Sequence, residues 1–248
     1  MKKQIIVDDN YEIERKLYEE GYNFICGTDE VGRGPLVGPV VASAVIMPKN
    51  VYIEGVTDSK KLSEKKRIEL KSIIEEKALA IETVFIEPSL IDEINIYEAS
   101  RLAMTKAIKS LKIRPDYILS DAMKLSVDEI PNLALIKGDL RSFVIGCASI
   151  VAKVERDNYM LELDHKYPEY NFKKNKGYPT KEHLAALEKY GVIPEHRKTY
   201  GPVKNKLIKD NQTTIFDFIK WLKRTFSKHL NVLFKYKIKK IPVGGNHG

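Results

Sequence analysis

Residues 28–40 read TDEVGRGPLVGPV and place two carboxylates, Asp29 and Glu30, just before an arginine that stands between two glycines. The residues on either side, 24–28 and 40–47, are rich in apolar, small and β-branched side chains, which is typical of buried strands. We therefore expect two paired strands joined by a glycine-rich turn. The acidic pair then closes a buried strand, where its charge needs a partner.

Strand and helix patterns alternate outward from this stretch. Further strands are expected from short apolar runs at residues 78–86, 116–120 and 133–136. Helices are expected from apolar spacing and capping residues at 11–22, 64–77 after Ser63, 88–111, 140–164 after Asp139 and 181–190 after Thr180. This order predicts an α/β fold over residues 1–210, with a mixed β-sheet flanked by helices.

Four acidic residues share a position at the ends of the expected strands: Asp29, Glu30, Asp121 and Asp139. Reactive groups converge at strand ends in α/β sheets, and four carboxylates gathered there would repel one another without cations. The pattern favours a divalent-metal site for Mg²⁺ or Mn²⁺, which suit oxygen ligands. Taken singly, Asp139 would also serve as a helix N-cap and Asp121 as the start of a turn.

The glycines at 32, 34 and 38 leave the backbone bare around Arg33. Glycine permits tight turns and close approach of the main chain to a ligand, and arginine offers donors that suit phosphate. The spacing differs from that of the dinucleotide-binding motif and of the P-loop. An ordinary hairpin turn would explain the same glycines, so spacing alone leaves both interpretations open.

A series of segments between about residues 22 and 206 resembles the bacterial ribonuclease HII family. In order, they are GTDEVGRGPLVGPVVASAVI, DSKKLSEKKR, DEINI, the strand ending at Asp121, KGD at 137–139, ASIVAKVERDNYM, NKGYPTKEH and YGPVK. The resemblance implies a ribonuclease H-like fold in which the four acids bind metal and catalyse. It implies that the ribonucleotide is sensed by Gly32, Arg33, Gly34 and Tyr178, with main-chain groups reaching the 2′-OH.

Other residues of these segments resemble family positions near the substrate backbone: Lys60, Lys61, Lys153, Arg156 and Lys176. Ser149, Lys153 and Arg156 share one helix face, which is also what a solvated polar face would show. The family commonly has glycine where Ala122 follows Asp121, a departure that bears on the turn there. His183 is interpreted as a polar helix residue and not as a general base.

The activity implied by the resemblance is hydrolysis of the phosphodiester on the 5′ side of a ribonucleotide, in RNA–DNA hybrids or embedded in duplex DNA. Two metal ions would assist, leaving 3′-hydroxyl and 5′-phosphate ends. One alternative is ribonuclease HIII, which usually carries an additional N-terminal substrate-binding domain. Another is a non-catalytic hybrid-binding module, which the four retained acids argue against because they would repel a polyanion.

Residues 211–248 differ in composition from the rest of the chain. They hold eight Lys and Arg against Asp217 alone, so all but one unit of the formal net charge of +8 comes from them. Apolar residues recur there at helical spacing: Ile215, Phe218, Ile219, Leu222, Phe226, Leu230 and Leu233. This predicts a basic amphipathic C-terminal helix that docks on the main domain, contacts nucleic acid or lies on a membrane surface.

The remaining expectations come from composition. Cys26 and Cys147 lie in apolar surroundings without metal-type spacing, which predicts buried free thiols. No apolar run reaches the length of a membrane span and no secretory leader is evident. We expect a cytoplasmic monomer whose partners are RNA–DNA hybrids and ribonucleotide-containing duplex DNA.

Overall fold

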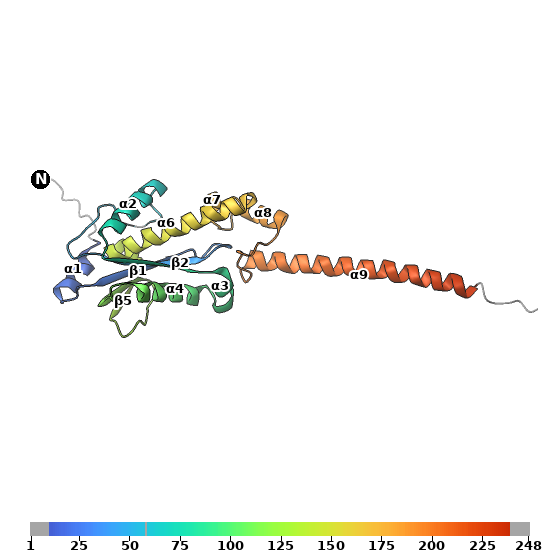
Figure 1. Ribbon diagram of the computed structural model, residues 1–248, viewed down its shortest axis with the longest axis horizontal. Coiled ribbons are helices and arrows are strands. Elements are labelled where there is room, and N and C mark those ends of the chain that lie inside the picture. Colours follow the sequence, from blue (N-terminus) through green and yellow to red (C-terminus); the bar gives the residue numbers. More distant parts are fainter. Residues whose placement is uncertain (1–9, 58, 239–248) are drawn as a thin grey trace, which may run out of the picture. The chain divides into compact units, whose positions relative to one another are not determined.

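A five-stranded mixed sheet forms the centre of the protein. The computed structural model describes residues 10–57 and 59–238 (Figure 1), and the chain divides into two compact units, 1–203 and 204–248. The strands of the first unit are β1 (Ile25–Val31), β2 (Val40–Ile46), β3 (Ala80–Ile86), β4 (Tyr117–Asp121) and β5 (Asn132–Leu135). Their order in the sheet is β3-β2-β1-β4-β5. The predicted α/β fold with a mixed sheet is confirmed.

Strand direction places the ends of β1, β4 and β5 together. β1 is antiparallel to β2, and β2 to β3, whereas β4 runs parallel to both β1 and β5. Thr28 lies beside Ser120 in this register, so the acidic residues that follow each of them come out at the same edge. Carboxyl ends of parallel strands are where α/β sheets carry their sites.

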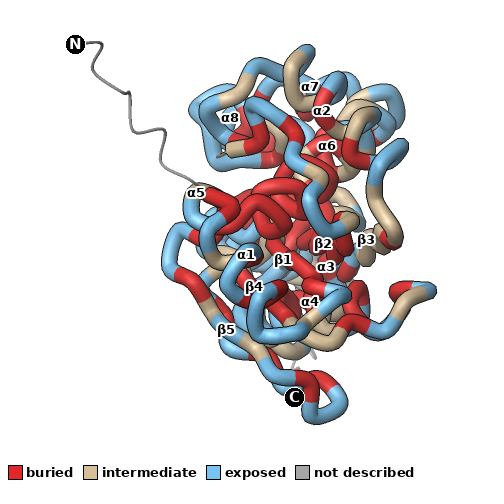
Figure 2. The backbone as a smooth tube through the Cα atoms, turned by 90° about the vertical axis from the view of Figure 1, so that its left-hand side faces the viewer, coloured by how far each residue is buried: buried red, intermediate tan, exposed pale blue. Residues whose placement is uncertain are grey.

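Helices cover both faces of the sheet. In chain order they are α1 (Glu12–Glu19), α2 (Glu64–Lys77), α3 (Pro88–Ile94), α4 (Ile96–Ser110), α5 (Gly138–Arg141), α6 (Phe143–Lys166), η1 (Pro168–Tyr170), α7 (Phe172–Asn175) and α8 (Lys181–Tyr190). Figure 1 shows α2 and α6 on one side of the sheet and α3 and α4 on the other. Val45 packs in one of the two resulting cores and Ala44 in the other. β2 is therefore buried along its whole length (Figure 2).

β1 packs against α6 at backbone distance. A Cβ added at Gly27 would lie 2.2 Å from the carbonyl carbon of Val144, so only glycine fits there. Cys26 and Cys147 are buried and free, as predicted. Burial raises the pKa of the Cys26 thiol to about 12, which keeps it protonated and unreactive.

Two expected helices are each divided in the structure. The helix expected at 88–111 breaks at Asn95, which has φ 67° and caps α4 by accepting from the amides of Tyr97 and Glu98. The helix expected after Asp139 begins at Phe143, because Ser142 is extended and its hydroxyl accepts from the amide of Ile145. The interpretation of Asp139 as an N-cap is therefore wrong.

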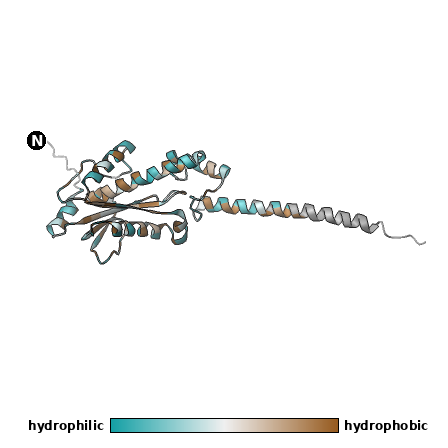
Figure 3. Cartoon of the chain, viewed as in Figure 1, coloured by the Kyte–Doolittle hydropathy of each residue, from teal (hydrophilic) through white to brown (hydrophobic). Residues whose placement is uncertain are grey.

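The second compact unit carries most of α9 (Gly201–Ile238), so the predicted C-terminal helix is present. The helix starts ten residues before the expected boundary and has no break at 210. Figure 3 shows hydrophilic and hydrophobic residues interleaved along its described part, and Ile208, Ile215, Phe218 and Ile219 are exposed. The expected apolar side chains of Phe226, Leu230 and Leu233, and residues 239–248, lie outside the described residues.

Candidate active site

The first two acids belong to β1 itself. Asp29 and Glu30 were expected to follow the strand, but β1 continues to Val31 and pairs them with Ser43 and Ala42 of β2. Asp29 is 7% exposed, and its Oδ1 accepts from the Glu30 amide at 2.7 Å. Both carboxylates are thus held by a strand in the middle of the sheet.

The other two acids are Asp121 at the end of β4 and Asp139 in α5, the short helix that follows β5. Asp121 ends β4, and its Oδ1 accepts from the Gly138 amide at 2.7 Å. A Cβ at Gly138 would lie 3.2 Å from that oxygen, so the glycine permits this close approach. Asp139 is the next residue and is 9% exposed. The sheet therefore brings all four predicted acids to one edge.

The acids of this edge share an unfavourable electrostatic environment. Burial raises the pKa of Asp29 well above its ordinary value, and the charges of Glu30 and Asp121 raise it further, against a hydrogen bond from Ser149. Burial also raises the pKa of Glu30 to about 7, with Arg33 opposing the shift and Asp121 adding to it. Carboxylates that repel one another and are shielded from water favour either protons or a bound cation.

The carboxylate oxygens of this edge are of the kind that binds a hard divalent cation, although Glu30 is paired with Arg33. Glu30 Oε1 lies 3.4 Å from Arg33 Nη1, while its Oε2 is buried without a hydrogen-bond partner. Within the described part of the chain, no three His, Cys, Asp or Glu side chains converge closely enough to hold a metal ion. The metal-binding role of the four acids therefore stays a prediction. Their oxygen atoms are of the kind that Mg²⁺ or Mn²⁺ prefers.

A buried arginine on α6 holds the glycine-rich segment from one side. Arg156 is fully buried and donates to the carbonyls of Pro39 at 3.2 Å, Val37 at 3.3 Å and Lys176 at 3.1 Å. Gly32 has φ +95°, and a Cβ there would lie 2.3 Å from Arg156 Nε. The segment therefore requires glycine both for its backbone conformation and for the space that the guanidinium fills.

A second buried arginine holds the same segment and was missed by the sequence analysis. Arg197 donates to the carbonyls of Gly32 at 2.6 Å, Arg33 at 3.0 Å and Gly38 at 2.8 Å. The hydroxyl of Tyr200 also donates to the Arg33 carbonyl, at 2.6 Å. The only available signal was their place in or beside the matched segment YGPVK, which does not reveal burial.

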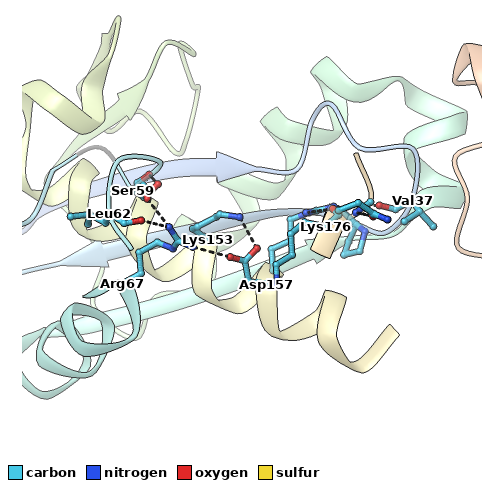
Figure 4. A network of polar contacts seen from close by, with 12 residues as sticks. Val37, Ser59, Leu62, Arg67, Lys153, Asp157 and Lys176 are labelled. Atoms are coloured by element: carbon cyan, nitrogen blue, oxygen red, sulfur yellow. Dashed lines mark hydrogen bonds and ion pairs between the residues drawn. The ribbon is translucent and has the colours of Figure 1, made fainter. Parts of the chain in front are cut away.

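The helix face defined by Ser149, Lys153 and Arg156 points inward. Ser149 is 5% exposed, with its Oγ 2.9 Å from Ser59 Oγ, and Lys153 Nζ lies 2.6 Å from Asp157 Oδ1 (Figure 4). The burial of Arg156 argues against a solvated face at this residue, and its expected place near the substrate backbone stays a prediction. Burial allows the guanidinium to bind carbonyls but leaves none of it at the surface.

Exposed predicted residues lie in two loops. Lys60 and Lys61 are exposed in the loop that precedes α2. Tyr178 is 43% exposed, and its ring borders Gly34, where an added Cβ would lie 3.3 Å from Tyr178 Cε1. The Gly177 carbonyl accepts from the Leu36 amide at 2.8 Å, which ties the Tyr178 turn to the glycine-rich segment. The structure thus brings together the residues expected to sense a ribonucleotide.

A buried histidine pair supports the Tyr178 turn. His183 and His196 are 0% and 1% exposed, and their Nε2 atoms lie 3.3 Å apart. His196 Nδ1 accepts from the Ile193 amide at 3.1 Å, so its proton is on Nε2 and is donated to His183. His183 Nδ1 then donates to the Tyr178 carbonyl at 2.9 Å. His183 is a helix residue, as interpreted, but one that fixes this turn.

We expect this pair to make stability fall in mild acid. Burial lowers the pKa of both histidines, that of His196 to about 4 from an ordinary value of 6.5. Between these values the unfolded chain binds protons that the folded chain does not, so the free energy of unfolding decreases as pH falls from about 6.5. The His196 contribution is on the order of 3 kcal/mol at most.

The measurement is urea denaturation of the wild type and of His196→Gln between pH 7.5 and 4.5. The variant should lose less stability over this range than the wild type. His165→Gln, which alters an exposed histidine, is the control and should keep the wild-type slope. Parallel pH profiles for the wild type and His196→Gln would contradict the assignment.

Comparisons with known proteins show which family the chain belongs to. The family model described as Ribonuclease HII matches residues 26–201. The chain is 52% identical over 213 residues to ribonuclease HII of Leuconostoc mesenteroides, covering 83% of this chain and 84% of the relative. It is 53% identical over 196 residues to ribonuclease HII of Enterococcus faecalis, covering 79% and 76%.

Solved structures agree on the fold. The ribonuclease H2 of Pyrococcus horikoshii aligns with a TM-score of 0.64 at 28% identity, covering 73% of this chain and 96% of that one. Bst-RNase HIII in complex with Mn²⁺ aligns with a TM-score of 0.57 at 15% identity, covering 77% and 71%, and shows the fold alone. The chain belongs to the ribonuclease HII family of endoribonucleases, which are hydrolases.

Proposed function

We propose that this chain hydrolyses the phosphodiester on the 5′ side of a ribonucleotide, leaving 3′-hydroxyl and 5′-phosphate ends. Membership of the ribonuclease HII family supports endonuclease action on RNA paired with DNA. The position of the cut is proposed from one observation: the acidic residues lie next to a glycine-rich segment whose backbone is not covered by side chains. Asp29, Glu30 and Asp121 interact at one sheet edge, and β1 leads directly into the Gly32–Gly34 segment.

Divalent metal ions, Mg²⁺ or Mn²⁺, would be held by Asp29, Glu30, Asp121 and Asp139. Bound there, they would stabilise negative charge at the scissile phosphate and make water more acidic. The Glu30 oxygen without a partner and the raised pKa values of Asp29 and Glu30 support this assignment. The chain itself keeps the carboxylates at the centre of the sheet and orients Asp29 through Ser149.

The glycine-rich segment would recognise the ribose. Its backbone carbonyls at Gly32, Arg33 and Gly38 are occupied by Arg197, which fixes the path of the chain. Gly34 carries no side chain where the Tyr178 ring approaches, so a nucleotide can meet the backbone and the ring together. The 2′-OH distinguishes RNA from DNA at such a position.

Cleavage of defined duplexes tests the proposal. The substrates are an all-DNA duplex, the same duplex with one ribonucleotide, and a long RNA–DNA hybrid, each with Mg²⁺, Mn²⁺ or chelator. We expect one cut 5′ of the single ribonucleotide, cutting of the hybrid, no cutting of DNA and no activity with chelator. Cutting 3′ of the ribonucleotide, or activity in chelator, would overturn the proposal.

Tyr178→Ala should discriminate between these substrates. If the ring packs against the deoxyribose next to the ribonucleotide, its loss should lower kcat/KM for the single-ribonucleotide duplex by about tenfold or more, the worth of one stacking contact. A long hybrid offers other registers and should lose much less. Tyr190→Ala, which removes another exposed tyrosine, is the control. Equal losses on both substrates with a lower melting temperature would make Tyr178 a packing residue.

The basic extension is proposed to contact the nucleic-acid backbone. Truncation after Asp210 removes eight Lys and Arg and one Asp. We expect weaker substrate binding and a shallower salt dependence, with the chemical step retained, because each phosphate contact adds about 0.9 to the slope of log K against log salt. Unchanged affinity across a salt titration, or loss of solubility, would instead favour a helix that docks on the main domain. Among the described residues, no helix has the length and apolar character to cross a bilayer.

A further inference from the structure

Three charged residues form a buried cluster between α2 and α6, which we call the Asp157 cluster. Asp157 is 4% exposed and receives Lys153 Nζ at 2.6 Å on one oxygen and Arg67 Nη2 at 3.4 Å on the other. The side chains of Arg67 and Lys153 are only 12% and 17% exposed. Figure 4 shows Arg67 and Lys153 reaching Asp157 from different elements. A single carboxylate therefore fixes two cations.

Arg67 uses its other terminal nitrogen, Nη1, to hold the loop before α2. Its Nη1 donates to the Ser59 carbonyl at 3.2 Å and to the Leu62 carbonyl at 2.6 Å. These two carbonyls bracket Lys60 and Lys61, whose side chains are exposed. The guanidinium thus fixes the two ends of the short segment that carries these lysines.

The same loop meets α6 at a second point. Ser59 Oγ lies 2.9 Å from Ser149 Oγ, and Ser149 belongs to α6 and is buried. The loop before α2 is therefore tied to α6 at Ser59 as well as through Arg67 and Asp157.

We propose that Arg67 and Asp157 are positioning residues, which hold residues 59–62 so that Lys60 and Lys61 meet the substrate phosphates. This inference rests on the proposed function. Neither residue touches the substrate, because both are buried. Their contribution therefore passes through the two exposed lysines.

A second ion pair between α2 and α6 provides a control for effects that come only from weaker packing of these two helices. Lys71 Nζ lies 2.9 Å from Glu155 Oε1 and 2.6 Å from Glu75 Oε1. Lys71 is as buried as Arg67, with 14% of its side chain exposed, but its ion pairs do not involve the loop. Lys71→Met therefore removes a tie between the same helices without releasing residues 59–62.

A double-mutant cycle tests the proposal. Arg67→Met, Lys60→Gln with Lys61→Gln, and the triple variant are compared for kcat, KM and salt dependence on the single-ribonucleotide duplex. We expect Arg67→Met to raise KM about tenfold and to reduce the salt slope by about 2, as the loss of two phosphate contacts would. In the Arg67→Met background, removing the lysines should add little, because they are already displaced. Lys71→Met should keep the wild-type KM.

The remaining outcomes decide against the proposal. Additive effects of Arg67→Met and the lysine substitutions, or an equal KM increase in Lys71→Met, would overturn it. Arg67→Lys, which keeps the charge near Asp157 but lacks the fork that reaches two carbonyls, covers the case in which Arg67→Met does not fold. A wild-type KM in Arg67→Lys would also overturn it. Failure of the wild type to cut this duplex would instead remove the proposed function.

Discussion

Asp29→Asn should lower kcat by about 10³-fold or more, equivalent to roughly 4 kcal/mol, without lowering the melting temperature. The amide keeps the shape of the side chain and an oxygen for the Glu30 amide, which donates to Asp29 at 2.7 Å. It removes a buried charge that the charges of Glu30 and Asp121 repel, and with it an anionic ligand for the metal ions. The variant should therefore be as stable as the wild type, or more stable.

Asp139→Asn should lose activity to a similar degree. Asp116→Asn is the matched control. Asp116 precedes β4, at the end of the strand opposite to Asp121, and accepts from the Asn23 and Phe24 amides there. That variant should keep its kcat. Turnover is measured on the single-ribonucleotide duplex in Mg²⁺, alongside thermal unfolding. Near-normal cleavage by Asp29→Asn would remove Asp29 from the catalytic set.

Arg197→Met should cost about 3–5 kcal/mol of unfolding free energy, the largest loss of stability that we expect. The side chain is fully buried and satisfies the carbonyls of Gly32, Arg33 and Gly38. Methionine fills a similar volume but leaves these acceptors buried without donors. Activity should fall as well, because the same carbonyls fix the segment that is proposed to read the ribose.

Urea denaturation of Arg197→Met and Arg114→Met measures this difference. Arg114 also donates to a carbonyl, that of Asp128 at 3.1 Å, but the contact is exposed, so water replaces it. The Arg114 variant should stay within about 0.5 kcal/mol of the wild type. Similar denaturation midpoints for the two variants would show that the buried carbonyls find other donors.

The fold could be predicted from the sequence where the pattern of apolar residues or a capping residue clearly indicated one kind of element. β2 is apolar except at Ser43 because it is buried on both faces, and Ser63 marks the start of α2 by accepting from the Lys66 amide. The break between α3 and α4 was missed, because Asn95 caps a helix from a left-handed conformation that apolar spacing does not reveal. Asp139 was interpreted as a cap because aspartate and serine are both common at that position. The residue that caps α6 is Ser142, three residues later.

The sequence predicted which residues belong to the candidate site, but not which of them are buried or which groups they contact. Helical spacing showed that Ser149, Lys153 and Arg156 share a face, yet it does not tell which face is buried, and this one packs inward. Arg197 and His196 were missed, because their partners are backbone atoms and a histidine 13 residues away. Such contacts depend on where loops meet, which local sequence patterns do not encode.

The missing side chain at Gly27 has a consequence for the alignment of β1. If the strand slipped by one residue, the side chain of Cys26 or Thr28 would have to occupy a space only 2.2 Å from the Val144 carbonyl carbon. Such a slip would also turn every side chain of the strand to the opposite face. Only one alignment of β1 is therefore compatible with the approach of α6. The same glycine keeps Asp29 and Glu30 from exchanging places.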